Sequence, residues 1–231
     1  MFDIGTGALA NMREHLDYDV IDHVVVSHMH ADHFFDLVPL RQGLKYGPLS
    51  RRERMPVFLP PGGRDALDAL RRAVAPDTAA DFFEADFAVS EYDPSPPMDI
   101  GDLRLTFAPT RHYIPGFAVR AERNGGSITY SSDTAPCDAV VTLARGGELF
   151  LCEASLGLGT EDGERGHSSA EEAGEMASRA GIGQLVLTHY GAGDSPDALV
   201  EAARRRFAGP VLAADDGDQF SVFGSSLGSE N

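Results

Sequence analysis

The hydrophobic pattern along the chain changes repeatedly between the period of a strand and the period of a helix. Short apolar or alternating runs, rich in β-branched and aromatic residues, predict strands. These runs cover residues 24–26, 57–59, 103–107, 127–132, 148–153 and 184–189. Apolar residues spaced three or four apart predict helices over residues 8–16, 64–74 and 196–207, and further helices that begin near residues 34 and 170. Strands and helices are therefore expected to follow one another over most of the chain.

Three local signals sharpen this pattern. Asn124-Gly125-Gly126 predicts a turn between two strands, because asparagine and glycine accept the left-handed backbone of a tight hairpin. Ser169 and Glu172 have the spacing of a capping box and predict a helix start. Pro196 after Ser195 predicts another, with serine as the N-cap.

The segment with the most distinctive chemistry, residues 28–33, has the sequence His-Met-His-Ala-Asp-His and lies between a predicted buried strand and a predicted helix. In an extended stretch residues i and i+2 point the same way, so His28 and His30 can converge on one metal ion. The turn at Asp32 and His33 directs the next pair towards a neighbouring position. Single histidines are usually structural, but three histidines and an aspartate within six residues predict a site for zinc or a related first-row ion.

Composition places the chain among globular proteins. Its 231 residues suit one domain over residues 1–231, and 42% apolar with 24% charged residues is ordinary for such a domain. There is no apolar stretch of about 18 residues and no secretory signal at the start, which favours a protein of the cytoplasm with no membrane partner. Cys137 and Cys152 are expected to be small buried residues, because two cysteines outside a Cys-x-x-Cys pair form no disulfide framework.

The formal net charge of −17 limits the partners. A surface this acidic repels phosphate backbones at long range, which disfavours non-specific binding of nucleic acid. A specific nucleic-acid substrate would need a local basic patch. The candidates for such a patch are two groups of three arginines, which are more often solvated faces: Arg51, Arg52 and Arg54, and Arg204, Arg205 and Arg206.

Five more candidate residues follow predicted strands or precede a predicted helix: His112, Asp133, Glu153, His167 and His189. Taken alone, each has a structural alternative. A histidine at a strand end is more often structural than a ligand, and an aspartate in a turn commonly caps a backbone group. His15 and His23 are interpreted as surface or structural histidines.

The sequence His-x-His-x-Asp-His after a strand resembles the signature of the metallo-β-lactamase superfamily of binuclear metallohydrolases. Cys152-Glu153-Ala154-Ser155 and Gly166-His167-Ser168-Ser169 resemble two segments of its ribonuclease Z-like branch. The resemblance implies an α/β fold, a four-layer αββα sandwich. The family has two or three strands before the aspartate-glycine turn that residues 3–7 resemble, and this sequence lacks them. A longer chain with those strands is therefore expected to be more soluble and more stable.

The resemblance also implies a site and a mechanism. Its two divalent ions, for which zinc is favoured and manganese or iron are alternatives, activate a bridging hydroxide. Asp133 bridges the ions, and Asp32 can also orient the hydroxide. His167 acts as general acid for the leaving group, and Glu153 orients His167. The ligands assigned in this way are His28, His30 and His112 for one ion, and Asp32, His33 and His189 for the other.

Several functions stay open. The acid pair favours a phosphodiesterase, whereas an enzyme for thioesters, lactones or lactams would need no separate acid. A scaffold that binds without turnover is disfavoured because all seven ligand positions hold competent groups. Ribonuclease Z proteins that process transfer RNA usually carry a long arm between the segments of His112 and Asp133, and residues 113–132 leave no room for one. The expected partner is therefore a small phosphodiester, with transfer RNA as the alternative, and a homodimer is compatible with the sequence.

Overall fold

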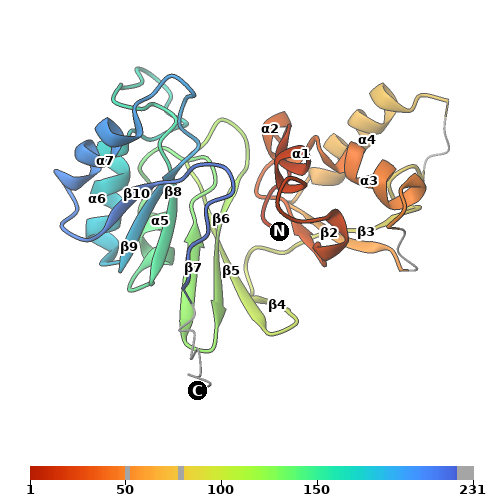
Figure 1. Ribbon diagram of the computed structural model, residues 1–231, viewed down its shortest axis with the longest axis horizontal. Coiled ribbons are helices and arrows are strands. Elements are labelled where there is room, and N and C mark those ends of the chain that lie inside the picture. Colours follow the sequence, from red (N-terminus) through yellow and green to blue (C-terminus); the bar gives the residue numbers. More distant parts are fainter. Residues whose placement is uncertain (50–52, 78–80, 223–231) are drawn as a thin grey trace. The chain divides into compact units, whose positions relative to one another are not determined.

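The computed structural model describes residues 1–49, 53–77 and 81–222. The chain divides into two compact units, Met1–Asp93 and Pro94–Asn231 (Figure 1). A single domain over residues 1–231 stays a prediction. Among the described residues, every helix is too short or too polar to cross a membrane.

Within the residues that the structure describes, the first unit contains a three-stranded parallel sheet and five helices. The strand order is β1-β2-β3, and Phe2 adds an isolated parallel bridge to Val25. The strands are β1 (Val24–Val25), β2 (Met55–Leu59) and β3 (Phe87–Glu91). The helices are α1 (Ala8–Met12), the 3₁₀ helix η1 (Tyr18–Val20), α2 (Ala31–Phe34), α3 (Leu37–Tyr46) and α4 (Gly63–Val74). The predicted helix over residues 64–74 is confirmed, whereas the one over residues 8–16 ends at Met12.

The break between α2 and α3 has a tertiary cause. The sequence favours a helix that begins near residue 34, but the structure ends one helix at Phe34 and begins another at Leu37. The backbone N–H of Asp36 donates to the carbonyl of Ile4 at 3.1 Å, and its carboxylate accepts from the N–H of Leu9 at 2.9 Å. These bonds to a distant segment take the place of a continuous helical ladder and tie the junction between α2 and α3 to the first residues of the chain.

The second unit contains a seven-stranded sheet with the order β10-β9-β8-β7-β6-β5-β4. The pairs from β4 to β7 are antiparallel and those from β7 to β10 are parallel. The strands are β4 (Met98–Ile100), β5 (Leu103–Pro109), β6 (Phe117–Arg123), β7 (Gly126–Tyr130), β8 (Leu149–Glu153), β9 (Gln184–Thr188) and β10 (Val211–Ala213). The helices are α5 (Asp138–Ala144), α6 (Ala170–Ala180) and α7 (Pro196–Arg204). The predicted α/β class, with helices beside sheets, is confirmed.

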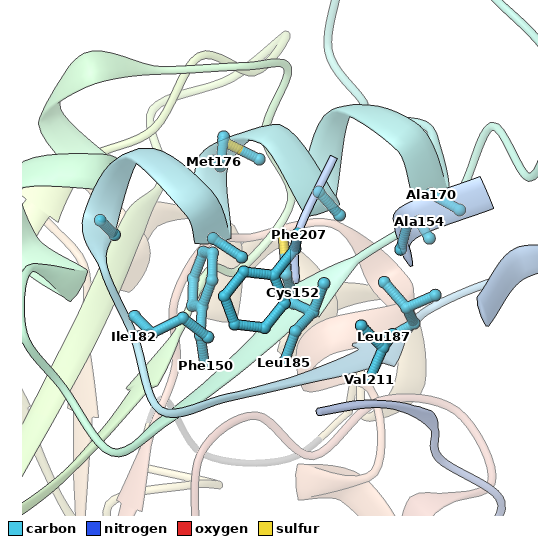
Figure 2. Close-up of a cluster of buried hydrophobic side chains, with 14 of the residues drawn as sticks. Phe150, Cys152, Ala154, Ala170, Met176, Ile182, Leu185, Leu187, Phe207 and Val211 are labelled. Atoms are coloured by element: carbon cyan, nitrogen blue, oxygen red, sulfur yellow. The ribbon is translucent and has the colours of Figure 1, made fainter. Parts of the chain in front are cut away.

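The parallel part of this sheet determines where its loops lie. Each parallel pair needs a crossover, which α5, α6 and α7 provide in turn. Figure 2 shows the core that holds them, in which Phe150, Leu185 and Leu187 of the strands pack together with Phe207 below Met176 of α6. The loops that follow β7, β8 and β9 therefore leave the sheet at one edge, at the carboxyl ends of neighbouring strands.

The local signals in the sequence mostly form as expected. Arg123 pairs with Gly126, so Asn124 and Gly125 alone make the turn between β6 and β7, both with positive φ (50° and 86°). The capping box of α6 is complete, since Ser169 and Glu172 each bind the other's backbone N–H. Ser195 is the N-cap residue of α7 and Pro196 begins the helix, as expected, although the Ser195 side chain makes no capping hydrogen bond. Cys152 is buried as expected, but Cys137 is only half-buried.

Candidate active site

In the first unit, His28 and His30 lie on the loop between β1 and α2, and His33 lies in α2. The Nε2 atom of His28 lies 3.2 Å from Nδ1 of His30, and the rings of His28 and His33 are 3.9 Å apart. Two imidazole nitrogens bound to one tetrahedral zinc ion would be roughly 3.3 Å apart, given zinc–nitrogen bonds of about 2.0–2.1 Å. His28 is fully buried, whereas the side chain of Asp32 is 59% exposed. The three imidazoles therefore converge, with Asp32 at the rim of the group.

Asp3 orients the ring of His33 directly and the ring of His28 through Ser27. Its Oδ2 accepts from Nδ1 of His33 at 2.7 Å and from Oγ of Ser27 at 2.7 Å, and its Oδ1 accepts from the N–H of Ser27 at 2.7 Å. Oγ of Ser27 in turn lies 3.1 Å from Nδ1 of His28. With protons on the Nδ1 atoms, Nε2 of His28 and of His33 carries the lone pair that a metal requires. Carboxylate support of this kind is typical of histidine ligands.

The role of Asp3 was missed from the sequence. The signal in the sequence is the Asp-Ile-Gly-Thr-Gly segment, which predicts a strand end and a turn but no contact with the histidines. Asp3 has a left-handed backbone (φ 53°), which aspartate tolerates better than most residues. Gly5 lies so close to the loop after β1 that a Cβ there would be 1.5 Å from the carbonyl oxygen of Asp32. Both features allow the turn of residues 3–7 to pack closely against residues 28–33.

In the second unit, Asp133 lies among three imidazoles. Its Oδ2 is 3.8 Å from Nε2 of His112 and 3.9 Å from Nδ1 of His167, and its Oδ1 is 3.7 Å from Nδ1 of His189. Asp133 follows β7 and His189 follows β9, so the parallel strand order brings them to one edge. Ser132 and His189 both have left-handed backbones (φ 53° and 54°). For non-glycine residues this is strained, and such strain is common where a side chain is aimed at a functional site.

His167 and Glu153 form a hydrogen-bonded pair. Nδ1 of His167 lies 3.0 Å from Oε1 of Glu153, whose side chain is 1% exposed. The glutamate also accepts from the N–H of Thr134 at 2.8 Å and from the N–H of Ser155 at 2.9 Å. The hydrogen bond to Glu153 raises the pKa of His167, against the lowering effect of burial. Ligand atoms of Glu153, His167 and His189 lie within 4.8 Å of one another, but the three donors on Glu153 favour an orienting carboxylate over a metal ligand.

The predicted site residues form two groups, one in each unit. The first unit brings together His28, His30 and His33, with Asp32 beside them. The second unit brings together His112, Asp133, Glu153, His167 and His189. The assignment of each ligand to a particular ion stays a prediction. His15 is exposed and His23 is stacked on Phe58 at 6.2 Å, and neither belongs to these groups.

Comparisons with known proteins identify the family to which the chain belongs. Residues 1–190 match the family described as the beta-lactamase superfamily domain. The chain therefore belongs to the metallo-β-lactamase superfamily, in its ribonuclease Z-like branch. Among its relatives, the uncharacterized protein Rv1339 of Mycobacterium tuberculosis is 34% identical in an alignment over 228 residues that covers 96% of this chain and 81% of Rv1339. The ribonuclease Z of Methanothermobacter thermautotrophicus is 27% identical, over 94% of this chain and 85% of that protein.

The fold is also that of a solved structure. The crystal structure of YhfI from Bacillus subtilis, a metallo-beta-lactamase fold protein, superposes with a TM-score of 0.81 at 24% identity. The match covers 94% of this chain and 84% of YhfI. The relatives support a hydrolase, and the family together with the histidine and aspartate groups indicates divalent metal ions.

Proposed function

We propose that the protein is a metal-dependent phosphodiesterase that acts on small phosphodiesters, with His167 as the general acid. The observation that carries the proposal is the His167–Glu153 pair, with 3.0 Å between Nδ1 and Oε1. Hydrolysis of a thioester or lactone needs no dedicated acid of this kind. A phosphodiester with an alkoxide leaving group does, because an alkoxide leaves slowly unless it is protonated.

The donor atoms fit divalent ions. The imidazoles of His28, His33 and His112 each have Nδ1 within hydrogen-bond distance of an oxygen atom, from Ser27, Asp3 and Gly166 respectively. This arrangement leaves Nε2 as the coordinating atom in each ring. Zinc is favoured by the number of imidazoles, with manganese or iron as alternatives. When bound, two such ions lower the pKa of a water molecule and stabilise negative charge on a reacting phosphate. The proposed ligands are His28, His30 and His112, then Asp32, His33 and His189, with Asp133 shared.

The acid step follows from the orientation of His167. Because Nδ1 donates to Glu153, a protonated ring carries its second N–H on Nε2, and this proton is available to the leaving oxygen. The raised pKa of His167 keeps the ring protonated at higher pH than an unpaired histidine. Glu153 is itself held by two backbone N–H groups, so it fixes the ring without rotating away.

The surface supports a small substrate over transfer RNA. Residues 113–132, where the resemblance implies an RNA-binding arm, are taken up by the short β6–β7 hairpin. Arg205 and Arg206 both contact Glu171, and Arg204 lies 3.5 Å from Glu201, so these arginines are balanced by acids. Of the other candidate patch, Arg51 and Arg52 lie outside the described residues. Because phosphate contacts supply most of the affinity for nucleic acids, a chain of net charge −17 is poorly suited to grip RNA.

Metal analysis and a substrate panel test the proposal. The purified protein is expected to contain close to two divalent ions, and Asp133→Ala to lose most of them. His167→Ala should slow an alkyl phosphodiester by about 10²–10⁴ and a p-nitrophenyl phosphodiester much less, because p-nitrophenolate leaves without help. His15→Ala is the matched control. Equal losses on both substrates would refute the acid role. Efficient cleavage of precursor transfer RNA, abolished in His167→Ala, would favour a ribonuclease instead.

A further inference from the structure

Tyr113 and Glu161 join the loop of His112 to the loop of His167, and the proposed function leaves both without a role. We propose that they are positioning residues that hold His167 in place for proton transfer. The contact between Tyr113 and Glu161 is called the latch below. This inference rests on the proposed function for the identity of the reaction, but the contacts that carry it lie wholly within the second unit.

Glu161 is the centre of the latch. One oxygen of its carboxylate, Oε1, accepts from the hydroxyl of Tyr113. The other, Oε2, accepts from the backbone N–H of Gly166 at 2.9 Å and lies 3.4 Å from the backbone nitrogen of His167. Hydrogen bonds to an ionised carboxylate are stronger than those between neutral groups. Glu161 therefore fixes the peptide that carries His167 and ties it to the Tyr113 side chain.

The Tyr113 ring packs against both imidazoles. Its centroid is 5.0 Å from that of His112 and 5.7 Å from that of His167. A Cβ at Gly166 would lie 2.4 Å from the Tyr113 ring, and the backbone of Gly166 is not in the left-handed region. Glycine at this position is thus explained by the close approach of the ring, because the backbone conformation alone would accept alanine.

The same peptide also orients His112. The carbonyl oxygen of Gly166 lies 2.8 Å from Nδ1 of His112. A shift of Gly166 would therefore disturb His112 as well as His167. At the far end of the loop, the guanidinium of Arg165 binds Glu172 at 2.7 Å and 2.8 Å, which anchors the loop to the first turn of α6. The latch therefore adds a second attachment of this segment, at the backbone of Gly166 and His167.

The exposure of Tyr113 argues against a purely structural role. Its side chain is 45% exposed, so the residue contributes little to the core. The contacts of this exposed tyrosine with two candidate site histidines and a loop carboxylate are better explained by a role in positioning those groups.

Tyr113→Phe is the sharpest test, because it removes the hydroxyl and keeps the ring. We expect kcat on an alkyl phosphodiester to fall about tenfold with KM nearly unchanged, since small misplacement of a catalytic group is costly. On a p-nitrophenyl phosphodiester, which needs no acid, the loss should be less than about threefold. Glu161→Gln should show the same split. The matched controls are Tyr18→Phe, which loses a hydroxyl bond to the carbonyl of Gly43, and Glu164→Gln, an exposed acid in the same loop.

Amide hydrogen exchange supplies a readout that does not depend on activity. The amides of Gly166 and His167 should exchange about five- to tenfold faster in Tyr113→Phe than in the wild type, while amides of the core strand β8 are unchanged. Unchanged exchange at both amides would overturn the latch, as would equal kinetic losses on the two substrates. A wild-type protein that hydrolyses no phosphodiester would refute the proposed function, and the exchange data alone would then decide whether the latch holds the loop.

Discussion

Replacement of Glu153 by glutamine removes the charge of the acid pair and keeps its size. Oε1 of Glu153 accepts from the N–H of Thr134 and from Nδ1 of His167, and Oε2 accepts from the N–H of Ser155. A glutamine has one acceptor oxygen and one NH₂ group, so in either orientation the NH₂ faces a donor. The less costly orientation places it against the N–H of Ser155 and leaves that donor unsatisfied.

An unsatisfied donor of this kind costs about 1–3 kcal/mol. For a chain of this size each kcal/mol lowers Tm by about 2–4 °C, so Glu153→Gln should melt roughly 2–12 °C below the wild type. Thermal unfolding monitored by circular dichroism measures the difference. Glu148→Gln, at the exposed start of the same strand, is the matched control and should change Tm by less than the range expected for Glu153→Gln.

The same substitution should shift the pH dependence of activity. The hydrogen bond to Glu153 is the largest cause of the raised pKa of His167. Because Glu153→Gln removes the negative charge from this partner, the pKa of His167 falls in the variant. A general acid must be protonated, and activity falls as pH rises through its pKa. The basic limb of kcat/KM for an alkyl phosphodiester should therefore move to lower pH in Glu153→Gln. A basic limb at the wild-type position, in a variant that is folded and melts lower as expected, would refute the pairing of Glu153 with His167.

Three further predictions concern Glu172, Gly174 and Asp3. Burial raises the pKa of Glu172, but the hydrogen bonds from Arg165 and Ser169 outweigh burial and lower it. The stabilisation by ionised Glu172 is therefore present above pH 4.5 and is lost as pH falls through the lowered pKa. The difference in Tm between wild type and Glu172→Gln should accordingly disappear in acid, and a difference that does not change with pH would contradict this. Gly174→Ala places a Cβ 2.3 Å from the Ala203 carbonyl and should cost about 1–3 kcal/mol in urea unfolding, whereas Gly193→Ala, with open space around it, should stay within about 0.5 kcal/mol. Asp3→Asn removes the negative charge that Asp3 places beside Nδ1 of His33, and it should weaken metal binding about 10- to 100-fold in chelator competition. Asp19→Asn, at an exposed position, is the control, and an unchanged metal affinity in Asp3→Asn would contradict the support of His33 by Asp3.

The sequence by itself determined what depends on neighbouring residues. The capping box of Ser169 and Glu172, the two-residue turn at Asn124 and Gly125, and the convergence of His28 and His30 all follow from spacings of a few residues. Over such distances backbone geometry leaves few alternatives, so the residue types and their spacing are sufficient. The alternation of strands and helices, and with it the α/β class, follows from the same kind of local periodicity.

Only the tertiary structure decided which distant residues meet. Asp3 supports His33 from 30 positions away, and Tyr113 reaches Glu161 across 48. Bonds from Asp36 to Ile4 and Leu9 likewise interrupt a helix that the apolar spacing continues. No local preference encodes these pairs, because each joins residues that are far apart in the chain and meet only in the folded structure. For Tyr113 and Glu161, the strand order of the second unit brings the loops after the strands to one edge. The residue types thus determine the chemistry proposed for the His167–Glu153 pair, while the folded sheet determines the geometry of the pair.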